Sequence, residues 1–275
     1  MKYVDLSEIK VIAGSSIGLL NSYAFSARKI GLIESMYRNI DISKNMELFG
    51  QVAFKSLLKR EIDALLSPQD CLETPLVFPV CRIPVFNANY YWVKGEYKPI
   101  WKKYITAAIN FPFLCVVPSV LDHRLAIDGG AADNIPIYSV LKRGVGFLNS
   151  GENFDLIIAL HFDARYDYRK EFKTDVPILD IDLGICNDFK KNHYNFSTAY
   201  IDEMLIKAEE YGHKICKKLF AGCCTRENLK EVINDIFLSE HTARQGNVSM
   251  DRLISMLNTF GRAFRSDVYC NHILY

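Results

Sequence analysis

The sequence lacks the segments that mark membrane-spanning and secreted proteins. Its 275 residues contain no run of the roughly 18 apolar residues that a membrane helix needs. The most apolar stretch, FPFLCVVPSVL, is interrupted by Pro112 and Pro118. The opening MKYVDLSEIK carries Asp5 and Glu8 and has no basic segment followed by an apolar one, so it does not resemble a secretory signal. We therefore expect a cytoplasmic protein.

The sequence also has no marked excess of positive or negative charge. The 33 basic and 32 acidic side chains leave a net charge of +1, and they are interspersed rather than gathered in blocks. A chain without a strong field of one sign does not steer nucleic acid or an anionic surface toward itself. We expect no nucleic-acid partner.

Metal-binding patterns are also missing. The eight cysteines include no C-x-x-C pair, the histidines are scattered, and no acidic loop of the calcium-binding type occurs. Cys223 and Cys224 are adjacent, and neighbours in sequence seldom form a disulfide. A chain of this length can bury a core without disulfides, so we expect reduced, mostly buried thiols and neither a metal nor a cofactor.

Strand-like and helix-like segments alternate along the chain. Apolar, β-branched runs predict strands over 9–14, 75–86, 89–95, 123–128, 154–162 and 176–183. Apolar residues at helical spacing predict helices over 46–66, 101–110, 197–220, 225–237 and 249–264, and one that follows Gly18 and stops at Gly31. This order predicts an α/β core over residues 1–190 and a helical extension over residues 191–275.

A small-residue corner joins the first predicted strand to the first predicted helix. In VIAGSSIG, Gly14 and Gly18 frame Ser16 in a G-x-S-x-G pattern. A serine needs a base and a fixed, exposed position to act as a nucleophile, and a sharp strand-to-helix turn supplies the position. The amide of Ile17, at the start of the helix, would then point at a developing oxyanion. A turn built of small residues for geometry alone, or Ser15 as the reactive serine, are the alternatives.

A second corner offers a base. Asp128 ends a predicted strand in AIDGGAADNIPI, and Gly129 and Gly130 after it allow close approach of another backbone. An aspartate is a weak base unless its site is dry. Asp-Gly is also a frequent hairpin turn. A third possibility is a Ser–Asp–His arrangement in which His161, at the end of the strand FDLIIALHF, is the base.

Together the two corners resemble the patatin-like phospholipases. That family has a G-x-S-x-G elbow before a small-residue helix, as in GSSIGLLNSYAF, and a D-G-G or D-G-A motif before an Asn-x-Pro stretch, as in DGGAADNIP. It also has a run of the type ATSAAFPFLFPP between them, where this chain has ITAAINFPFLCVVP. A buried strand follows, as in FDLIIALHF. The resemblance covers roughly residues 1–185.

The resemblance implies a fold and a chemistry. The fold would be a three-layer α/β/α sandwich with a mostly parallel central sheet. Ser16 would be the nucleophile and Asp128 the base, with Gly14 and Gly18 shaping the elbow and Gly129 and Gly130 shaping the aspartate loop. Asn134 and Pro136 would be structural. The substrates would be lipid or phospholipid acyl esters, and peripheral contact with a membrane would accompany them.

One departure from the family is large. Its glycine-rich oxyanion loop lies upstream of the elbow, whereas the thirteen residues before Gly14 contain no glycine. Losing one oxyanion donor typically lowers a rate by about 10²–10³. Three explanations are open: the start is internal to a longer protein, which we favour; another chain supplies the loop; or the chain is an inactive member.

The sequence thus leads to a serine acyl hydrolase that cleaves fatty-acyl esters through Ser16 and Asp128. The alternative is a catalytically inactive protein that keeps the fold and binds lipid or a partner.

Overall fold

The computed structural model describes residues 4–39, 59–110, 118–141, 146–148, 153–161, 169, 172, 174–183, 197–220, 224–225, 227–241 and 270–275. The chain divides into two compact units. We call Lys10–Glu152 with Met256–Tyr275 the elbow unit, and Met1–Ile9 with Asn153–Ser255 the strand-pair unit. The predicted boundary at residues 190 and 191 lies outside the described residues and stays a prediction.

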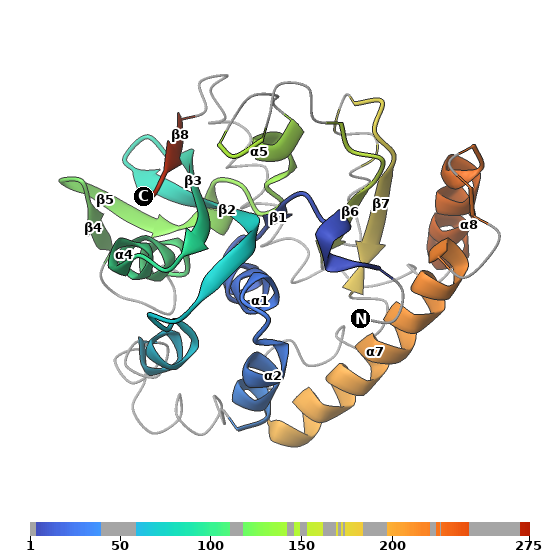
Figure 1. The fold of residues 1–275 in the computed structure, drawn as a ribbon, viewed down its shortest axis with the longest axis horizontal. Coiled ribbons are helices and arrows are strands. Elements are labelled where there is room, and N and C mark those ends of the chain that lie inside the picture. Colours follow the sequence, from blue (N-terminus) through green and yellow to red (C-terminus); the bar gives the residue numbers. More distant parts are fainter. Residues whose placement is uncertain are drawn as a thin grey trace. The chain divides into compact units, whose positions relative to one another are not determined.

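The elbow unit is built on a six-stranded sheet (Figure 1). Its strands are β1 (Ile12–Ala13), β2 (Cys71–Ile83), β3 (Asn87–Glu96), β4 (Ser119–Leu121), β5 (Arg124–Asp128) and β8 (Cys270–Ile273). The order is β4-β5-β2-β3-β8, and β1 also pairs with β2. The β2–β3, β2–β5 and β4–β5 pairs are antiparallel, whereas β1–β2 and β3–β8 are parallel. The predicted mostly parallel sheet, and with it the parallel patatin sandwich, is therefore wrong.

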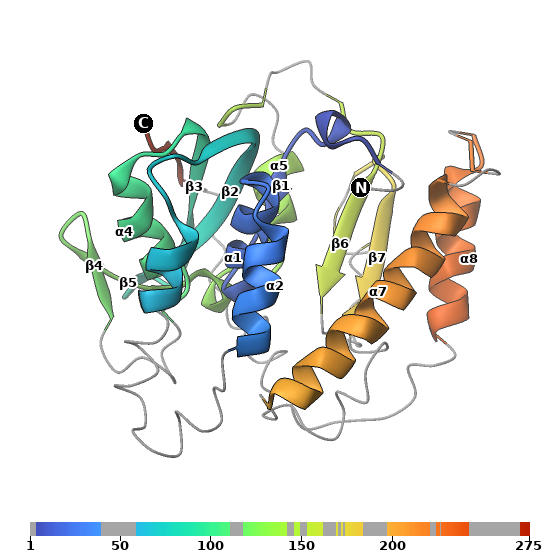
Figure 2. The ribbon, with the colours of Figure 1, turned by 60° about the horizontal axis from the view of Figure 1, so that its bottom comes forward.

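The two long strands explain why this sheet is the centre of the unit. Residues 75–82 of β2 and 88–93 of β3 are almost continuously buried, so both faces of the sheet are covered. On one face lie α1 (Ile17–Ser26), α2 (Ile30–Asn39) and α4 (Pro99–Ala108). Leu19 and Tyr23 of α1 and Trp101 of α4 are fully buried there against Phe78 of β2. Figure 2 shows α1 running beside α2.

The opposite face of the sheet is covered by the chain that follows β5. This segment includes the short helices η2 (Gly129–Ala131) and α5 (Ile137–Leu141). The hydroxyl of Tyr90 donates a hydrogen bond to Asp133, and both residues are buried. Gly146 lies so close to Trp92 that a Cβ there would come within 2.2 Å of the indole. Helices on one face and helical turns on the other confirm the coarse α/β class.

The strand-pair unit holds β6 (Ile157–His161), β7 (Ile178–Asp182), α7 (Thr198–Phe220), α8 (Leu229–His241) and the short helix η1 (Leu6–Glu8). The strands β6 and β7 pair in parallel. Leu179 and Ile181 of β7 pack with Ile215 and Leu219 of α7 and with apolar residues of α8. Figure 2 shows both helices beside this strand pair.

One helix boundary differs from its prediction. Gly31 was expected to stop the first helix, but α1 ends at Ser26, and Gly31 lies in the first turn of α2. The chain turns at Arg28, whose φ of 57° is left-handed. At the end of α1, the amide of Ala27 donates a hydrogen bond to the carbonyl of Tyr23, and the amide of Arg28 donates one to the carbonyl of Phe25. Most of the predicted helix 46–66 and all of 249–264 lie outside the described residues. Within the described part of the chain, no helix has the length and apolar character needed to cross a membrane.

Candidate functional site

The two sequence corners meet because β1 and β5 share one edge of β2. The other edge of β2 is occupied by β3. On the shared edge, β1 runs parallel to β2 and stops opposite Val77, whereas β5 runs antiparallel and stops where Asp128 faces Val80. The two strands therefore point at each other and end three residues apart along β2. This places the elbow after β1 against the aspartate loop after β5.

Ser16 occupies the sharp turn between β1 and α1. Its φ of 54° and ψ of −133° fall in a region that side-chain-bearing residues rarely adopt, a strain typical of functional sites. Ser16 is half-buried, and its Oγ donates a hydrogen bond of 2.6 Å to Oδ2 of Asp128. The structure thus brings together the predicted nucleophile and the predicted base across 112 residues of sequence.

The two glycines of the elbow differ in what they do. A Cβ on Gly14 would lie 2.5 Å from the Ser22 hydroxyl and 2.7 Å from the carbonyl of Gly18, so only glycine fits there. A Cβ on Gly18 would meet no atom of the described residues within 4 Å. Gly14 therefore shapes the turn, while Gly18 leaves open space beside the first turn of α1.

Asp128 is held from both sides. Its side chain is 1% exposed, and its Oδ1 accepts a hydrogen bond of 2.7 Å from the amide of Gly130. Its own amide donates to the carbonyl of Asn110 at 3.0 Å. Oδ2 is the oxygen that faces Ser16. The carboxylate is fixed in orientation, because one oxygen accepts a hydrogen bond from the loop and the other accepts one from the Ser16 hydroxyl.

The residues after Asp128 make a loop that only small side chains permit. A Cβ on Gly129 would lie 2.1 Å from the carbonyl oxygen of Pro79, and one on Gly130 would lie 3.1 Å from Asp128 Oδ1 and 3.3 Å from Asn134 Oδ1. Asn134 therefore lies against the loop. Pro136 precedes α5, and its carbonyl accepts a hydrogen bond from Ser139.

Burial changes the acidity of the aspartate. Desolvation raises the pKa of Asp128 from its usual value near 3.8 to about 6, although the hydrogen bonds from Ser16 and Gly130 act in the opposite direction. A carboxylate with a pKa near 6 is a better base than an exposed one and is still ionised at neutral pH. Its geometry and its acidity both suit removal of the Ser16 proton.

The start of α1 supplies hydrogen-bond donors beside Ser16. Ile17 is the first residue of the helix and Gly18 the second, and the first amides of a helix have no carbonyl one turn earlier to bond to. The helix dipole adds a partial positive charge at the same point. The predicted oxyanion donor, the amide of Ile17, therefore lies directly after the nucleophile.

Sequence reasoning missed two supports of the aspartate. Asn110 acts through its backbone carbonyl, a group that every residue has, so the residue type does not reveal this support. The buried pair of Tyr90 and Asp133 braces the loop from β3, and the amide of Asp133 also donates to the carbonyl of Gly129 at 2.9 Å. The second Asp in DGGAAD was the available signal for this brace.

The rival groups are placed differently. His161 pairs with Asp180 on the neighbouring strand of its own unit, and both side chains are fully buried. Ser15 is buried, and its hydroxyl has no hydrogen-bond partner among the residues that the structure describes. Burial raises the pKa of the Cys81 thiol, next to Asp128, to about 12, so it is not a thiolate at neutral pH. No group of three potential metal-ligating side chains occurs among the described residues.

No protein-family model matches this chain, and a search of curated proteins gives no match either.

Proposed function

We propose that the chain is a serine acyl hydrolase that acts on lipid esters, a divergent relative of the patatin-like phospholipases in its motifs though not in the direction of its strands. The observation that carries the proposal is the 2.6 Å hydrogen bond from Ser16 on its strained turn to the buried Asp128. A cytoplasmic location is part of the proposal. Of the free cysteines in the described part of the chain, Cys81 is buried and Cys71 is exposed, so the expected burial of the thiols is only partly confirmed.

In the proposed reaction, the Ser16 oxygen attacks the acyl carbon while its proton moves to Oδ2 of Asp128. The amide of Ile17 stabilises the oxyanion of the tetrahedral intermediate. Collapse breaks the ester bond, and the proton passes from Asp128 to the departing alcohol. Water then attacks the acyl-enzyme and gives a proton to Asp128. The bond between the acyl carbon and the Ser16 oxygen breaks, Asp128 returns the proton to that oxygen, and the fatty acid leaves.

A fluorophosphonate probe tests the nucleophile directly. We expect the folded protein to gain one adduct, which peptide mass spectrometry locates at Ser16. The Ser16→Ala variant should gain none. Ser15→Ala is the matched control, because it removes the neighbouring hydroxyl and leaves the Ser16–Asp128 bond in place.

Two results would count against the proposal. An adduct on another residue would assign the chemistry elsewhere. A folded wild-type protein that takes no adduct and hydrolyses no p-nitrophenyl ester of any chain length would favour the inactive, lipid-binding alternative.

A further inference from the structure

The outer edge of β5 is supported by two different segments. Along most of this edge β5 pairs with β4, but the pairing ends where Ser119, the first residue of β4, stands opposite Ala126. The amide of Asp128, two residues farther along β5, instead donates a hydrogen bond of 3.0 Å to the carbonyl of Asn110. Asn110 therefore continues the support of β5 beyond the end of β4, at the candidate base.

Asn110 is itself fixed by two further hydrogen bonds. It lies two residues after α4, and its amide donates to the carbonyl of Ala107 at 3.2 Å. Its side chain is buried, and Nδ2 donates a hydrogen bond of 3.1 Å to Oγ of Ser119. The residue thus connects the end of α4, the start of β4 and the aspartate at the end of β5. Any residue has a carbonyl to offer Asp128, but the bond to Ser119 requires a side chain that can donate.

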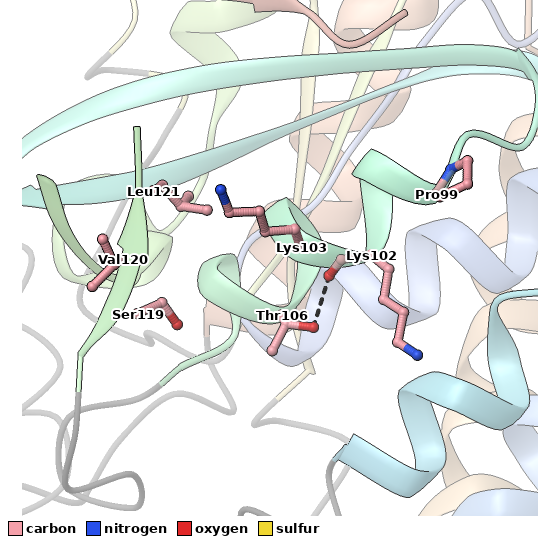
Figure 3. A pocket seen from close by; sticks show the side chains of 7 residues that line it. All are labelled: Pro99, Lys102, Lys103, Thr106, Ser119, Val120 and Leu121. Carbon is pink, nitrogen blue, oxygen red and sulfur yellow. Dashed lines mark hydrogen bonds between the residues drawn. The ribbon is translucent and has the colours of Figure 1, made fainter. Parts of the chain in front are cut away.

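Ser119 marks the boundary with solvent. A groove of about 450 Å³ lies between α4 and β4, and Thr106 lines it from the helix while Ser119 lines it from the strand (Figure 3). The Thr106 hydroxyl donates to the carbonyl of Lys102 within α4, so it does not compete for Ser119. Ser119 is half-buried, whereas Asn110 and Asp128 are 4% and 1% exposed. Exposure thus falls stepwise from the groove to the carboxylate, and Asn110 stands at the middle step.

We propose that Asn110 is a positioning residue for the candidate base: its side-chain bond to Ser119 holds its carbonyl on the Asp128 amide and shuts out water from the groove. The inference rests on the proposed function, since it gives Asn110 a part in the action of the base, and it assigns Asn110 no contact with the substrate. A base that is held at a fixed angle and kept dry removes the Ser16 proton more effectively than a mobile, hydrated one.

The acidity of Asp128 reports on this closure. Burial is the largest cause of the rise in its pKa to about 6, and its two hydrogen bonds act in the opposite direction. Two further titratable groups lie nearby, the thiol of Cys81, which is neutral at pH 7, and the buried carboxyl of Asp133 in the same loop. Water that enters from the groove would favour the charged carboxylate, so the pKa of Asp128 should then fall toward its usual value near 3.8.

An NMR titration tests the inference without any need for turnover. The carboxyl carbons of the aspartates are followed from pH 4 to pH 8, and the signal of Asp128 is the one that is missing from Asp128→Asn. We expect Asp128 to titrate at a lower pH in Asn110→Ala than in the wild type. Ser119→Ala, which breaks the same bond from the other side, should shift the titration in the same direction. The double variant should show no larger shift than Asn110→Ala alone, because both changes remove one bond.

Ester turnover supplies a second readout. Asn110→Ala should lower turnover at neutral pH by about 10- to 100-fold, because the base is no longer held in place. Its pH profile should level off at a lower pH than that of the wild type. Ser119→Thr keeps the hydroxyl and should keep the wild-type profile. Thr106→Val is the matched control, because it removes a hydroxyl from the same groove whose hydrogen bond stays within α4.

An Asp128 signal that titrates at the wild-type pH in Asn110→Ala would overturn the inference, as would an equal shift in Thr106→Val. A wild-type protein that titrates as expected but turns over no ester would count against the hydrolase and not against the closure around Asp128. Far-UV circular dichroism verifies that each variant is folded, and Ser119→Ala keeps the test decisive if Asn110→Ala does not fold.

Discussion

Each unit of the molecule contains a buried aspartate paired with a polar side chain from a distant segment. In the elbow unit, Asp128 accepts a hydrogen bond from Ser16. In the strand-pair unit, Asp180 pairs with His161. Both pairs stand on strands, and sequence reasoning offered Ser16, Asp128 and His161 as candidate catalytic groups.

The difference between the pairs lies in access and strain. His161 is the last residue of β6 and Asp180 lies in the middle of β7, and both side chains are fully buried. Ser16 is half-buried on a turn with a left-handed φ, next to open space at Gly18. A group that reacts with a substrate must be reached, whereas a group that stabilises a fold need not be. The first pair therefore has the geometry of a reactive site and the second that of a structural one.

Removing the charge of Asp128 gives the sharpest test of this difference. Asp128→Asn keeps the shape of the side chain but removes the base, so ester turnover should fall by roughly 10³-fold or more. Thermal stability at neutral pH should not fall, because a neutral amide is less costly to bury than a carboxylate. The wild-type rate should rise with pH up to about 6 and then level off, as Asp128 ionises. A variant with full turnover at every pH would remove Asp128 from the mechanism.

The opposite result is expected for the structural pair. Asp180→Ala removes the carboxylate that pairs with the fully buried His161 and should cost about 3 kcal/mol of unfolding free energy, measured by chemical denaturation. Probe labelling at Ser16, normalised to folded protein, should be unchanged. Asp175→Ala, at an exposed position of the same unit, is the control and should cost little. Loss of Ser16 labelling in folded Asp180→Ala would instead revive His161 as a catalytic group.

The raised pKa of Asp128 also links stability to pH. In the unfolded chain its pKa is near 3.8, and in the folded protein it is about 6. The folded state therefore binds the proton more tightly, so this stabilisation is complete below pH 4 and is lost as pH rises through 6. From pH 4 to pH 8, the unfolding free energy of the wild type should therefore fall by roughly 3 kcal/mol relative to that of Asp128→Asn. Parallel pH profiles for the two proteins would show that the carboxyl is not desolvated.

The sequence predicted the local parts of this site and failed on the distant ones. The strand, corner and helix around Ser16 depend on neighbouring residues, as does the strand ending at Asp128, and both were predictable. The direction of strand pairing was not, because a run such as PLVFPVCR, residues 75–82, is buried on both faces and has the same pattern in a parallel or an antiparallel sheet. The support from the Asn110 carbonyl was hidden because any residue has a carbonyl.

The smallest predicted effect concerns the two glycines of the elbow. Gly18→Ala adds a methyl group where no atom of the described part of the chain lies within 4 Å, and it replaces glycine in a helix, so stability should rise by a few tenths to about 1 kcal/mol. Gly14→Ala places the same methyl group against Ser22 and Gly18 and should destabilise the protein by more than that gain.

If Gly18→Ala also slows turnover of long-chain esters while its labelling by a small fluorophosphonate is unchanged, the open space beside Gly18 accommodates the acyl substrate. Equal slowing for small and large reagents would mean that the methyl group disturbs Ser16 itself, and the open space would then have no role in substrate binding.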